Sequence, residues 1–505
     1  MDFLEDRPEH RHLTDHIRII PARRLLPAVR ITEGIIVFPD NPKEQDMSPS
    51  LKQDPAAYAA ADLAHVWHHL VQHQALAGKG PMIVVEGEGL KLRDINGREY
   101  LDATSGGVWC VNVGYGRERI ARAVYEQMKA MPYYAATAGN IPYIEFAEKL
   151  LAHMPGLTRA YLSNSGSEAN EKAYKMVRAL AHLSGNTAKK KILFRARDYH
   201  GTTLGALSST GQAERKEWFG PLVPGFVEFP HACCYRCAFG KSYPGCDIDC
   251  ARAVERIIEM EGPETVGGLI VEPITAGGGV IPPVAEYYTV LADICRRHGV
   301  LLIMDEVVCG MGRTGTMFGY QHYGVTPDIV TMAKGVASAY MPISVTATTE
   351  AVFNAFLNDP ADKMAYFRDI STYGGCAAGC SAALENMAII EEEKLLDNVV
   401  AMGDYLLAGL RELAALPYVG DVRGKGLLCG IELVQDKASK KPVAEGKVIQ
   451  VVGEMAANGV LVGRTNRSLP GYNNIINIAP AYVVTRGDID VILRTLRAAL
   501  EKVLG

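Results

Sequence analysis

The 505-residue sequence has no long uncharged apolar run, and its first residues lack the apolar core of a signal peptide. No apolar stretch approaches the roughly 18–20 residues that a membrane-spanning helix needs. The opening MDFLEDRPEHRHLTDH is instead rich in charged side chains. From these two absences we expect a cytoplasmic protein with no segment in a membrane.

A strong charge of one sign is also missing. The chain has 52 basic and 57 acidic residues, and its formal net charge of −5 gives no general attraction to phosphate backbones, so nucleic acid is not an expected partner. Eleven cysteines in a chain of this length and expected location predict reduced thiols. With 48% apolar and 22% charged residues, the composition is that of a globular protein with two or more domains.

The character of the sequence changes twice along the chain. Residues 1–50 mix Arg, Pro and His without a sustained period, which predicts a poorly ordered extension, and Met47 as an alternative start stays open. Between about 115 and 385, short apolar runs alternate with helical patterns. After about 385 we expect long amphipathic helices, a strand pair and a final helix over 488–503, typical of a smaller α+β part.

Four apolar runs in the middle of the chain predict strands that are buried on both faces. Near-continuous runs of this kind, separated by helical segments, are typical of a parallel sheet in an α/β domain. The residues before Gly299 form an apolar stripe with a basic last turn, which predicts a helix over 286–299. The four runs are KILF (191–194), GGLIVEPI (267–274), GVLLIMDEV (299–307) and PDIVTMAKG (327–335).

Three features of this region can carry chemistry, although each has a simple structural explanation when taken alone. Asp305 ends a predicted strand, where open α/β sheets place their ligands, or it only caps a loop. Lys334 follows the next strand, where an amine in apolar surroundings becomes a good nucleophile, or it only extends to water. Residues 165–168 (SGSE) begin a helix whose free N–H groups suit a phosphate, or they form a plain capping box of Ser165 and Glu168.

The order of the three features favours chemistry over structure. A phosphate-type turn, an acid at a strand end and a lysine at the next strand end is the layout expected for pyridoxal 5′-phosphate. The phosphate binds at the helix turn, and the carboxylate keeps the pyridine nitrogen protonated so that the ring acts as an electron sink. The lysine holds the cofactor covalently.

Seven segments extend this pattern, and with them the chain resembles the class III aminotransferases over roughly residues 55–500. The resemblance implies a type I fold of pyridoxal-phosphate-dependent transferases, with a mostly parallel sheet in a large domain (116–384). A smaller α+β domain would come from both chain ends (51–115 and 385–505). The segments are NSGSEAN (164–170), DYHG (198–201), EP (272–273), DEV-x-x-G-x-GRTG (305–315), MAKG (332–335), STYGG (371–375) and RGKGL (423–427).

The resemblance also implies roles for single residues and active sites shared across a homodimer or a dimer of dimers. Asp305 would pair with the ring nitrogen, and Lys334 would both hold the cofactor and carry protons. Glu272 and His200 would have supporting roles near the cofactor. The remaining implied cofactor contacts are Ser165, Gly166 and Ser167 on the phosphate, Thr372 on the phosphate of the neighbouring subunit, and Tyr199 and Val307 on the two faces of the ring.

Longer sequence segments indicate which substrates the enzyme would use. Segments such as SGGVWCVNVGYGR (105–117), EPITAGGGVIPP (272–283) and GVLVGRTNRS (459–468) are similar to the branch of the family that moves the amine of taurine to pyruvate. That reaction would yield sulfoacetaldehyde and alanine. A general aminotransferase for ω-amino acids or amines, with pyruvate as the acceptor, stays open as the alternative.

Both substrates of that reaction are anions, so the site needs a cation. Arginine suits carboxylate and sulfonate oxygens because its planar fork donates two parallel hydrogen bonds. The candidates are Arg464, at the position of a switching arginine in ω-aminotransferases, and Arg423 in RGKGL. Arg467 is a third, for which a surface ion pair stays open. Trp109 and Tyr133 match segments that wall the substrate pocket.

Two alternatives to a transaminase stay open, another enzyme class on this scaffold and a non-enzyme interaction protein. Pyridoxal-phosphate decarboxylases and aminomutases share this scaffold, and a pyruvate-dependent burst of alanine would separate them from a transaminase. Cys234, Cys237, Cys246 and Cys250 have spacings that resemble a zinc knuckle, or they lie in a surface loop as reduced thiols. Because the gap between the two pairs is shorter than in ribbon-type sites, we predict no functional metal site.

Overall fold

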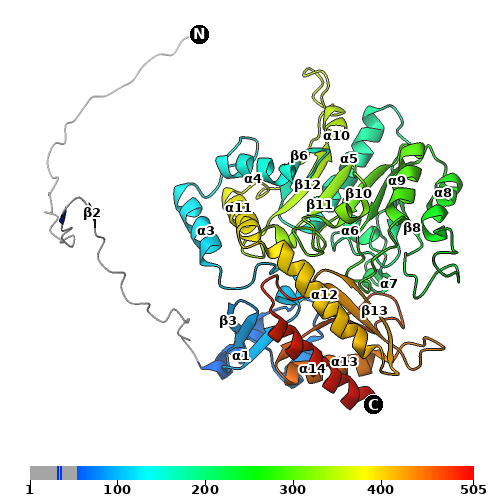
Figure 1. The fold of residues 1–505 in the computed structure, drawn as a ribbon. Helices are drawn as coiled ribbons and strands as arrows, with labels where there is room; N and C mark the ends of the chain where they lie inside the picture. The colour runs from blue at the N-terminus through cyan, green and yellow to red at the C-terminus, as the bar shows by residue number, and fades with distance from the viewer. Residues whose placement is uncertain (1–30, 33–34, 37–53) are drawn as a thin grey trace, which may run out of the picture. The chain divides into compact units, whose positions relative to one another are not determined.

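A seven-stranded sheet is the centre of the computed structural model, which describes residues 31–32, 35–36 and 54–505 (Figure 1). The strand order is β6-β12-β11-β10-β9-β7-β8, and β8, β7, β9, β10 and β11 run parallel to one another while β12 is antiparallel to both of its neighbours. The bounds are β6 Leu157–Ser163, β7 Lys191–Arg195, β8 Phe226–Phe229, β9 Val266–Val271, β10 Leu301–Asp305, β11 Ile329–Met332 and β12 Ser344–Thr349.

The predicted buried strands are confirmed. Every residue of β9 and of β11 is buried, as expected of parallel strands that are covered on both faces. Strands β9, β10 and β11 are shorter than their apolar runs, because the chain leaves the sheet near the polar residues that end each run, whereas β7 is one residue longer than KILF. Strand β10 stops at Asp305, and β11 stops two residues before Lys334. Both side chains therefore follow the carboxyl ends of neighbouring strands.

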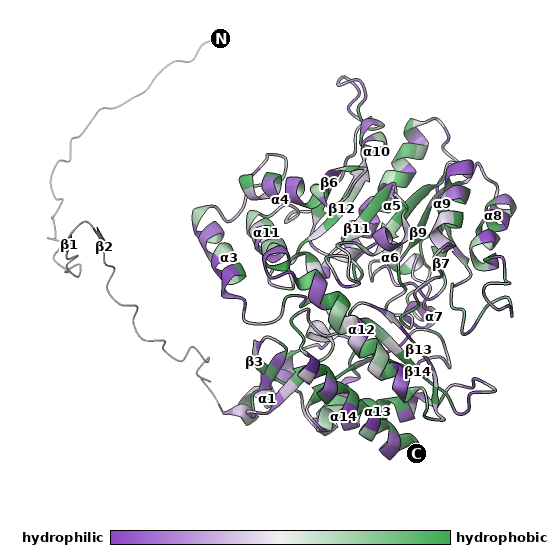
Figure 2. Cartoon of the chain, in the orientation of Figure 1, coloured by the Kyte–Doolittle hydropathy of each residue, from purple (hydrophilic) through white to green (hydrophobic). Residues whose placement is uncertain are grey.

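Helices flank this sheet, and Figure 2 shows both hydrophobic and hydrophilic residues along them. Helix α5 (Gly166–Leu183) buries Ala173, Met176 and Val177, the apolar face predicted from the sequence. Helix α9 (Tyr287–His298) ends at Gly299, whose φ of +58° favours glycine. The other helices of this region are α3 Glu118–Ala130, α4 Ile141–Ala152, α6 Leu204–Ser208, α7 Ala213–Lys216, α8 Asp249–Glu261, α10 Glu350–Asn354 and α11 Ala377–Glu392, with single 3₁₀ turns at Gly319–Tyr323 and Lys334–Val336.

Two four-stranded sheets form the part of the molecule drawn at the bottom of Figure 1, where blue and red segments lie side by side. In one of them β15 pairs in parallel with β5, with Val460 opposite Leu101, so residues far apart in sequence share a sheet. The strands are β3 Val84–Glu88, β4 Lys91–Asp94 and β5 Glu99–Asp102 with β15 Val460–Leu461, and β13 Val419–Lys425, β14 Leu428–Leu433 and β17 Ile475–Ile478 with β16 Gly463–Arg464.

The structure corrects the prediction for the last third of the chain. We expected one strand pair there, but β13 to β17 and the helix α13 (Glu445–Ala457) are present in addition to α12 (Leu395–Leu413) and α14 (Arg486–Leu504). Strands β15 and β16 have two residues each, too few to show a period of two in the sequence. The remaining helices are α1 Pro55–His65 and α2 His73–Lys79. The domain boundaries at 116 and 385 stay predictions.

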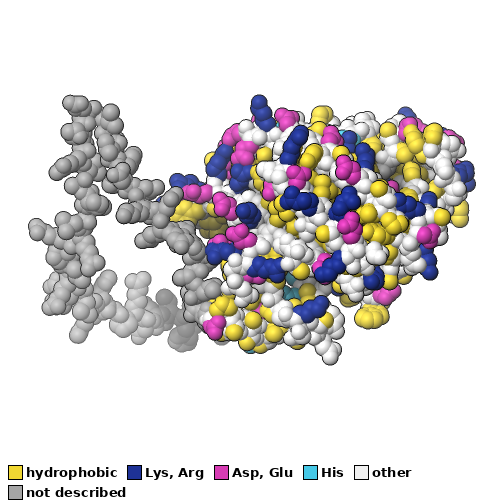
Figure 3. Space-filling model, turned by 60° about the horizontal axis from the view of Figure 1, so that its bottom comes forward, with side chains coloured by type: hydrophobic (Ala, Val, Ile, Leu, Met, Phe, Trp, Pro, Cys, Tyr) yellow, Lys and Arg dark blue, Asp and Glu magenta, His cyan; other side chains and the backbone are white. Residues whose placement is uncertain are grey.

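The N-terminal segment is described only in part. Strands β1 (Ile31–Thr32) and β2 (Ile35–Ile36) form an antiparallel pair, and the rest of the predicted extension over residues 1–50 lies outside the described residues. Within the described part of the chain, no helix is long and apolar enough to cross a membrane. Basic and acidic side chains are intermixed on the face of the molecule shown in Figure 3.

Candidate active site

Asp305 is held at the end of β10 by three hydrogen bonds. The side chain is 2% exposed, and its Oδ2 accepts from His200 Nδ1 at 2.7 Å and from Asn170 Nδ2 at 2.9 Å. Its Oδ1 accepts from the backbone N–H of Val307 at 3.0 Å. Since the carboxylate can only accept, His200 must carry its proton on Nδ1. Asp305 is thus fixed in orientation inside the protein.

The two side chains that hold Asp305 are themselves fixed. Asn170 also donates to the carbonyl of His200 at 2.7 Å and accepts from Thr331 Oγ1 at 2.7 Å. His200 is 2% exposed, and its Nε2 has no hydrogen-bond partner among the described residues. The sequence assigned His200 a supporting role near the cofactor but gave none to Asn170. Asn170 lies one helical turn after Gly166, which was the available signal.

The first turn of α5 lies against the segment that follows β10. Ser165 is the N-terminal cap, and its Oγ accepts from the backbone N–H of Glu168 at 3.3 Å. Only this half of the expected capping box is present, because the Glu168 carboxylate accepts from the N–H of Asn164 at 2.7 Å and not from that of Ser165. A Cβ at Gly166 would lie 2.9 Å from Cγ2 of Val307, which leaves room only for glycine. Ser167 Oγ accepts from the backbone N–H of Thr202 at 3.0 Å. The turn and Val307 are therefore direct neighbours.

Lys334 begins the 3₁₀ turn after β11 and has a φ of +41°, a conformation that side-chain-bearing residues rarely adopt. Its Nζ forms no hydrogen bond or ion pair to the described residues and lies 5.5 Å from the ring centre of Trp109. Trp109 closes a tight turn over Ser105–Trp109 in which Gly106 and Gly107 also have positive φ. The amine thus points at the aromatic wall that the sequence predicted for the substrate pocket.

Tyr199 and Glu272 lie beside this group. The backbone N–H of Tyr199 donates to Glu272 Oε1 at 2.9 Å, and Oε2 accepts from the N–H of Ala276 at 3.0 Å. Burial raises the pKa of Glu272 well above its usual range, with the charges of Asp198 and Asp305 acting in the same direction. By accepting this hydrogen bond, Glu272 fixes the backbone at Tyr199, the residue expected to cover one face of the cofactor ring.

Thr372 forms no hydrogen bond with the other predicted cofactor residues among the described residues of this chain. It is exposed, and its carbonyl accepts from the hydroxyl of Tyr133 at 2.8 Å. The ring of Tyr133 also packs edge-on against Tyr373 at 5.6 Å. The roles predicted for Thr372 in a neighbouring subunit and for Tyr133 in the pocket wall stay predictions.

Arg423 is fully engaged inside the protein. Its Nη1 pairs with Asp421 at 2.6 Å and with Glu432 at 2.8 Å, while Nε and Nη2 donate to the carbonyl of Gly279. Nε also donates to the carbonyl of Val280 at 2.9 Å. A substrate anion could bind Arg423 only by displacing these partners. The substrate role predicted for Arg423 has no support from this geometry and stays a prediction.

Arg464 and Arg467 are less constrained. Arg464, in β16, donates through Nη1 to Glu445 at 2.6 Å and to the carbonyl of Thr465 at 3.1 Å, and its other N–H groups form no bond to the described residues. Arg467 donates through Nη2 to the carbonyl of Leu70 at 2.6 Å and forms no ion pair within the described part of the chain. The surface ion pair weighed for Arg467 is thus not what holds it here.

These residues fit pyridoxal 5′-phosphate. The contacts Asp305–Asn170 and Gly166–Val307 join a buried carboxylate to the N-terminus of an 18-residue helix. A lysine amine without a hydrogen bond follows the neighbouring strand, three residues after Thr331, which pairs with Asp305. The helix N-terminus offers free N–H groups and a favourable dipole to a phosphate. The carboxylate offers an acceptor to a protonated ring nitrogen.

A comparison with protein families decides the assignment. Residues 74–500 match the model of "Aminotransferase class-III". The chain belongs to the class III aminotransferase family. This class III enzyme is 55% identical to the taurine–pyruvate aminotransferase of Rhodobacter capsulatus over 90% of its own length and 98% of that protein's length. It is 54% identical to the hypotaurine/taurine–pyruvate aminotransferase of Paracoccus denitrificans, covering 91% and 99% of the two chains.

The fold agrees with this assignment. The solved structure of the ω-transaminase from Pseudomonas jessenii in complex with PMP superposes on the class III enzyme with a TM-score of 0.83, at 32% identity and with 88% and 98% of the two chains covered. The predicted type I fold and the pyridoxal 5′-phosphate cofactor are confirmed. The division of roles among the site residues rests on the geometry above and on the resemblance.

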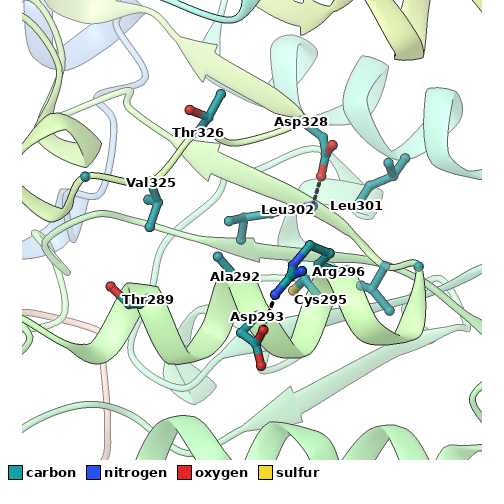
Figure 4. Close-up of a pocket in the computed structure, with 13 residues that line it drawn as sticks. Thr289, Ala292, Asp293, Cys295, Arg296, Leu301, Leu302, Val325, Thr326 and Asp328 are labelled. Carbon is teal, nitrogen blue, oxygen red and sulfur yellow. Dashed lines mark hydrogen bonds and ion pairs between the residues drawn. The ribbon is translucent and has the colours of Figure 1, made fainter.

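A large cavity of the class III enzyme lies elsewhere. It measures about 590 Å³ and opens between α9 and the start of β10, the opposite end of the strand from Asp305 (Figure 4). Its polar groups are occupied, since Asp328 accepts from the N–H of Leu302 at 2.8 Å and Arg296 pairs with Asp293. Open α/β sheets bind their ligands at the carboxyl ends of strands, so this cavity is not the active site.

The cysteine segment forms a small site of its own. Cys234, Cys237, Cys246 and Cys250 line a cavity of about 20 Å³ together with His231. In residues 54–505 and the two short strands before them, no group of three or more His, Cys, Asp or Glu side chains is arranged to hold a metal ion. The prediction that metal is absent or dispensable is left for elemental analysis to test.

Proposed function

We propose that this aminotransferase moves the amino group of taurine to pyruvate, producing sulfoacetaldehyde and alanine. The observation that carries the proposal is the 55% identity to the Rhodobacter capsulatus enzyme, because it extends over 90% of this chain and 98% of that protein. The alternative is a general ω-amino acid or amine aminotransferase with pyruvate as acceptor.

Asp305, Lys334 and Trp109 have different roles in the proposed reaction. When bound, pyridoxal 5′-phosphate supplies an electron sink for the carbon that bears the amine. Asp305 holds the proton of the ring nitrogen, with its own orientation fixed by His200 and Asn170. Lys334 binds the cofactor and, once released, carries a proton to and from the substrate carbon. Trp109 limits the space on the substrate side.

Arg464 meets the substrate anion in this proposal. Its one ion pair, with Glu445, involves Nη1 only, and Glu445 is partly exposed. The guanidinium can therefore exchange a solvent-accessible glutamate for a substrate carboxylate at small cost, since exposed ion pairs contribute about 0–1 kcal/mol. We assign the acceptor carboxylate of pyruvate to Arg464.

The assembly and the location are part of the same proposal. Thr372 is exposed in the single chain and forms no hydrogen bond to the other predicted cofactor residues within the described part of it, which a homodimer with shared sites explains. All eleven cysteines are free thiols, as is usual in the cytoplasm. We propose a cytoplasmic homodimer or dimer of dimers.

A panel of half-reactions tests the substrates. The enzyme is mixed with taurine, hypotaurine, β-alanine, 4-aminobutyrate or putrescine, without acceptor, and conversion of the cofactor is followed by absorbance. Taurine should convert the enzyme fastest at equal concentration. If β-alanine or putrescine converts the enzyme faster than taurine, the taurine proposal is wrong and the enzyme is a general ω-aminotransferase. A burst of alanine on adding pyruvate distinguishes both from a decarboxylase or an aminomutase.

A further inference from the structure

A second cavity adjoins Tyr199 and has two arginines in its wall. It measures about 660 Å³, and its apolar lining includes Leu207, Trp218 and Phe219. Arg215 and Arg467 lie in the same lining. Arginine side chains in a pocket beside a cofactor-facing tyrosine are unusual unless a charged partner neutralises them, because burying an unpaired charge is costly.

Arg215 has no such partner among the described residues. Its guanidinium carbon lies 4.7 Å from the ring centre of Tyr199, and its Nε donates to Gln212 Oε1 at 2.6 Å. Neither Nη atom forms a hydrogen bond or ion pair in the described part of the chain. Burial lowers the pKa of Arg215, and the positive charge of Arg467 acts in the same direction.

Arg467 is held in place by its backbone and by a single bond. Its φ of +49° is rare for a residue with a side chain, and Nη2 donates to the carbonyl of Leu70 at 2.6 Å. The next residue, Ser468, is anchored from both sides, since its N–H donates to Asn473 and its carbonyl accepts from the N–H of Glu214. The guanidinium is therefore presented to the cavity by a fixed loop.

The carboxylates of the cavity form no ion pair with either arginine in the described part of the chain. Glu214 and Glu217 also line the cavity. Glu214 accepts from Asn473 Nδ2 at 2.8 Å, and neither glutamate forms an ion pair with Arg215 or Arg467 in the described residues. The cavity lining thus holds two guanidinium groups that no ion pair engages within the described residues.

The arginine pair is connected to the reaction centre through Gln212. A Cβ placed on Gly277 would lie 3.4 Å from Gln212 Nε2 and 3.9 Å from Cη2 of Trp109, so both side chains border the same glycine. Trp109 in turn lies 5.5 Å from Lys334 Nζ. Arg215 is therefore linked to the surroundings of Lys334 by two sets of contacts, one to Tyr199 directly and one through Gln212 and Trp109.

We propose that Arg215 and Arg467 form the subsite that receives the anionic group of the amino donor, the sulfonate in the case of taurine. The proposal rests on the function proposed above and adds the residues that distinguish donor from acceptor. A sulfonate presents three oxygens, and two planar guanidinium forks can each take a pair of them. Arg464 is then left for the carboxylate of pyruvate, which explains how one enzyme handles anions that differ in length.

The test compares Arg215→Gln and Arg467→Gln with the control Arg486→Gln. The control removes one charge and a similar contact, since Arg486 is exposed at the start of α14 and lies 5.0 Å over the ring of Tyr405 in α12. The kcat/KM of the half-reaction is measured with taurine and with propylamine, which lacks the anion. We expect each pocket variant to lose roughly 10-fold or more with taurine relative to propylamine, mostly in KM, because a charge-assisted hydrogen bond to the anion is lost. The control should keep the wild-type ratio.

A second measurement does not depend on turnover. Ethanesulfonate, which has no amine, is titrated into the holoenzyme while tryptophan fluorescence is followed, with Trp218 in the cavity wall as the reporter. The wild type should bind it with an affinity that falls as salt is added. Arg215→Gln and Arg467→Gln should bind it at least 10-fold more weakly, and Arg215→Lys should recover only part, since a point charge lacks the fork.

The outcomes separate the two proposals. If taurine is a poor donor for the wild type but ethanesulfonate still binds and the variants lose it, the taurine function is wrong and the subsite stands. If taurine is the preferred donor and both glutamine variants keep its KM and the affinity for ethanesulfonate, the subsite is wrong. Should Arg215→Gln not fold, Arg467→Gln and the salt dependence decide in the same way.

Discussion

The replacement of Asp305 by asparagine tests the centre of the proposed site. The carboxylate accepts three hydrogen bonds, two on Oδ2 from His200 and Asn170 and one on Oδ1 from the N–H of Val307. An amide has only one accepting atom, so at least one of these buried donors must face an NH2 group. The better orientation keeps the oxygen toward His200 and Asn170 and leaves Val307 without an acceptor.

The expected magnitudes follow from this count. One unsatisfied buried donor costs about 1–3 kcal/mol in the free energy of unfolding, which a globular protein of this size should tolerate. The loss of negative charge beside the ring nitrogen acts on the rate. By analogy with the removal of one preorganised charge-stabilising group, the half-reaction should slow by at least roughly 10²–10³-fold.

A matched control exists at the other end of the same strand. Asp328 also accepts a backbone N–H of β10, that of Leu302 at 2.8 Å (Figure 4). The Asp328→Asn variant can keep that bond through its amide oxygen. Asp328 lies at the start of β11, the opposite end of that strand from Lys334. Its half-reaction rate should stay within a few-fold of the wild type.

The assay mixes each holoenzyme with taurine in a stopped-flow instrument and follows the cofactor absorbance. Cofactor content is measured separately, so that a lost cofactor is not taken for a slow step. If Asp305→Asn retains its cofactor and reacts within a few-fold of Asp328→Asn, Asp305 does not hold the proton of the ring nitrogen and its assigned role is wrong.

Three further predictions concern the rest of the site. Lys334→Ala should lose the absorbance of covalently held cofactor and nearly all turnover, and a cofactor that borohydride still fixes to the variant would contradict the assignment. Thr372→Ala should weaken cofactor binding in a dimer of unchanged size, whereas sedimentation of a fully active monomer would exclude shared sites. Elemental analysis should find no zinc needed for activity, and one zinc per chain with activity lost on chelation would reverse this view of Cys234, Cys237, Cys246 and Cys250.

The sequence predicted the parts of the site that lie at strand ends. Buried runs place Asp305 and Lys334 on neighbouring parallel strands, and a helix start places residues 165–168 at the same edge. These are local patterns with one long-range rule, that parallel strands align their carboxyl ends. Local patterns of the same kind predicted which face of α5 is apolar and that α9 ends at Gly299.

The parts that the sequence could not predict depend on contacts between distant segments. Arg215 follows Tyr199 by sixteen residues, and nothing in the sequence places its guanidinium over that ring. The saturation of Arg423 involves a carbonyl more than 140 residues earlier, at Gly279. The sequence makes these arginines equally plausible ligands for a substrate anion. Only the structure shows that the N–H groups of Arg423 are hydrogen-bonded within the protein, whereas the Nη atoms of Arg215 have no partner among the described residues.

The parallel pairing of β5 with β15 has a consequence for synthesis on the ribosome. Leu101 pairs with Val460, and the turn that carries Trp109 begins three residues after β5. The central sheet, by contrast, is complete once Thr349 has been made. A nascent or truncated chain that ends before residue 460 can therefore form the central sheet and the first turn of α5, where the phosphate is expected. It lacks β15, the strand that pairs with β5 just before the turn that carries Trp109. Competence for the reaction should arise only as the last tenth of the chain emerges.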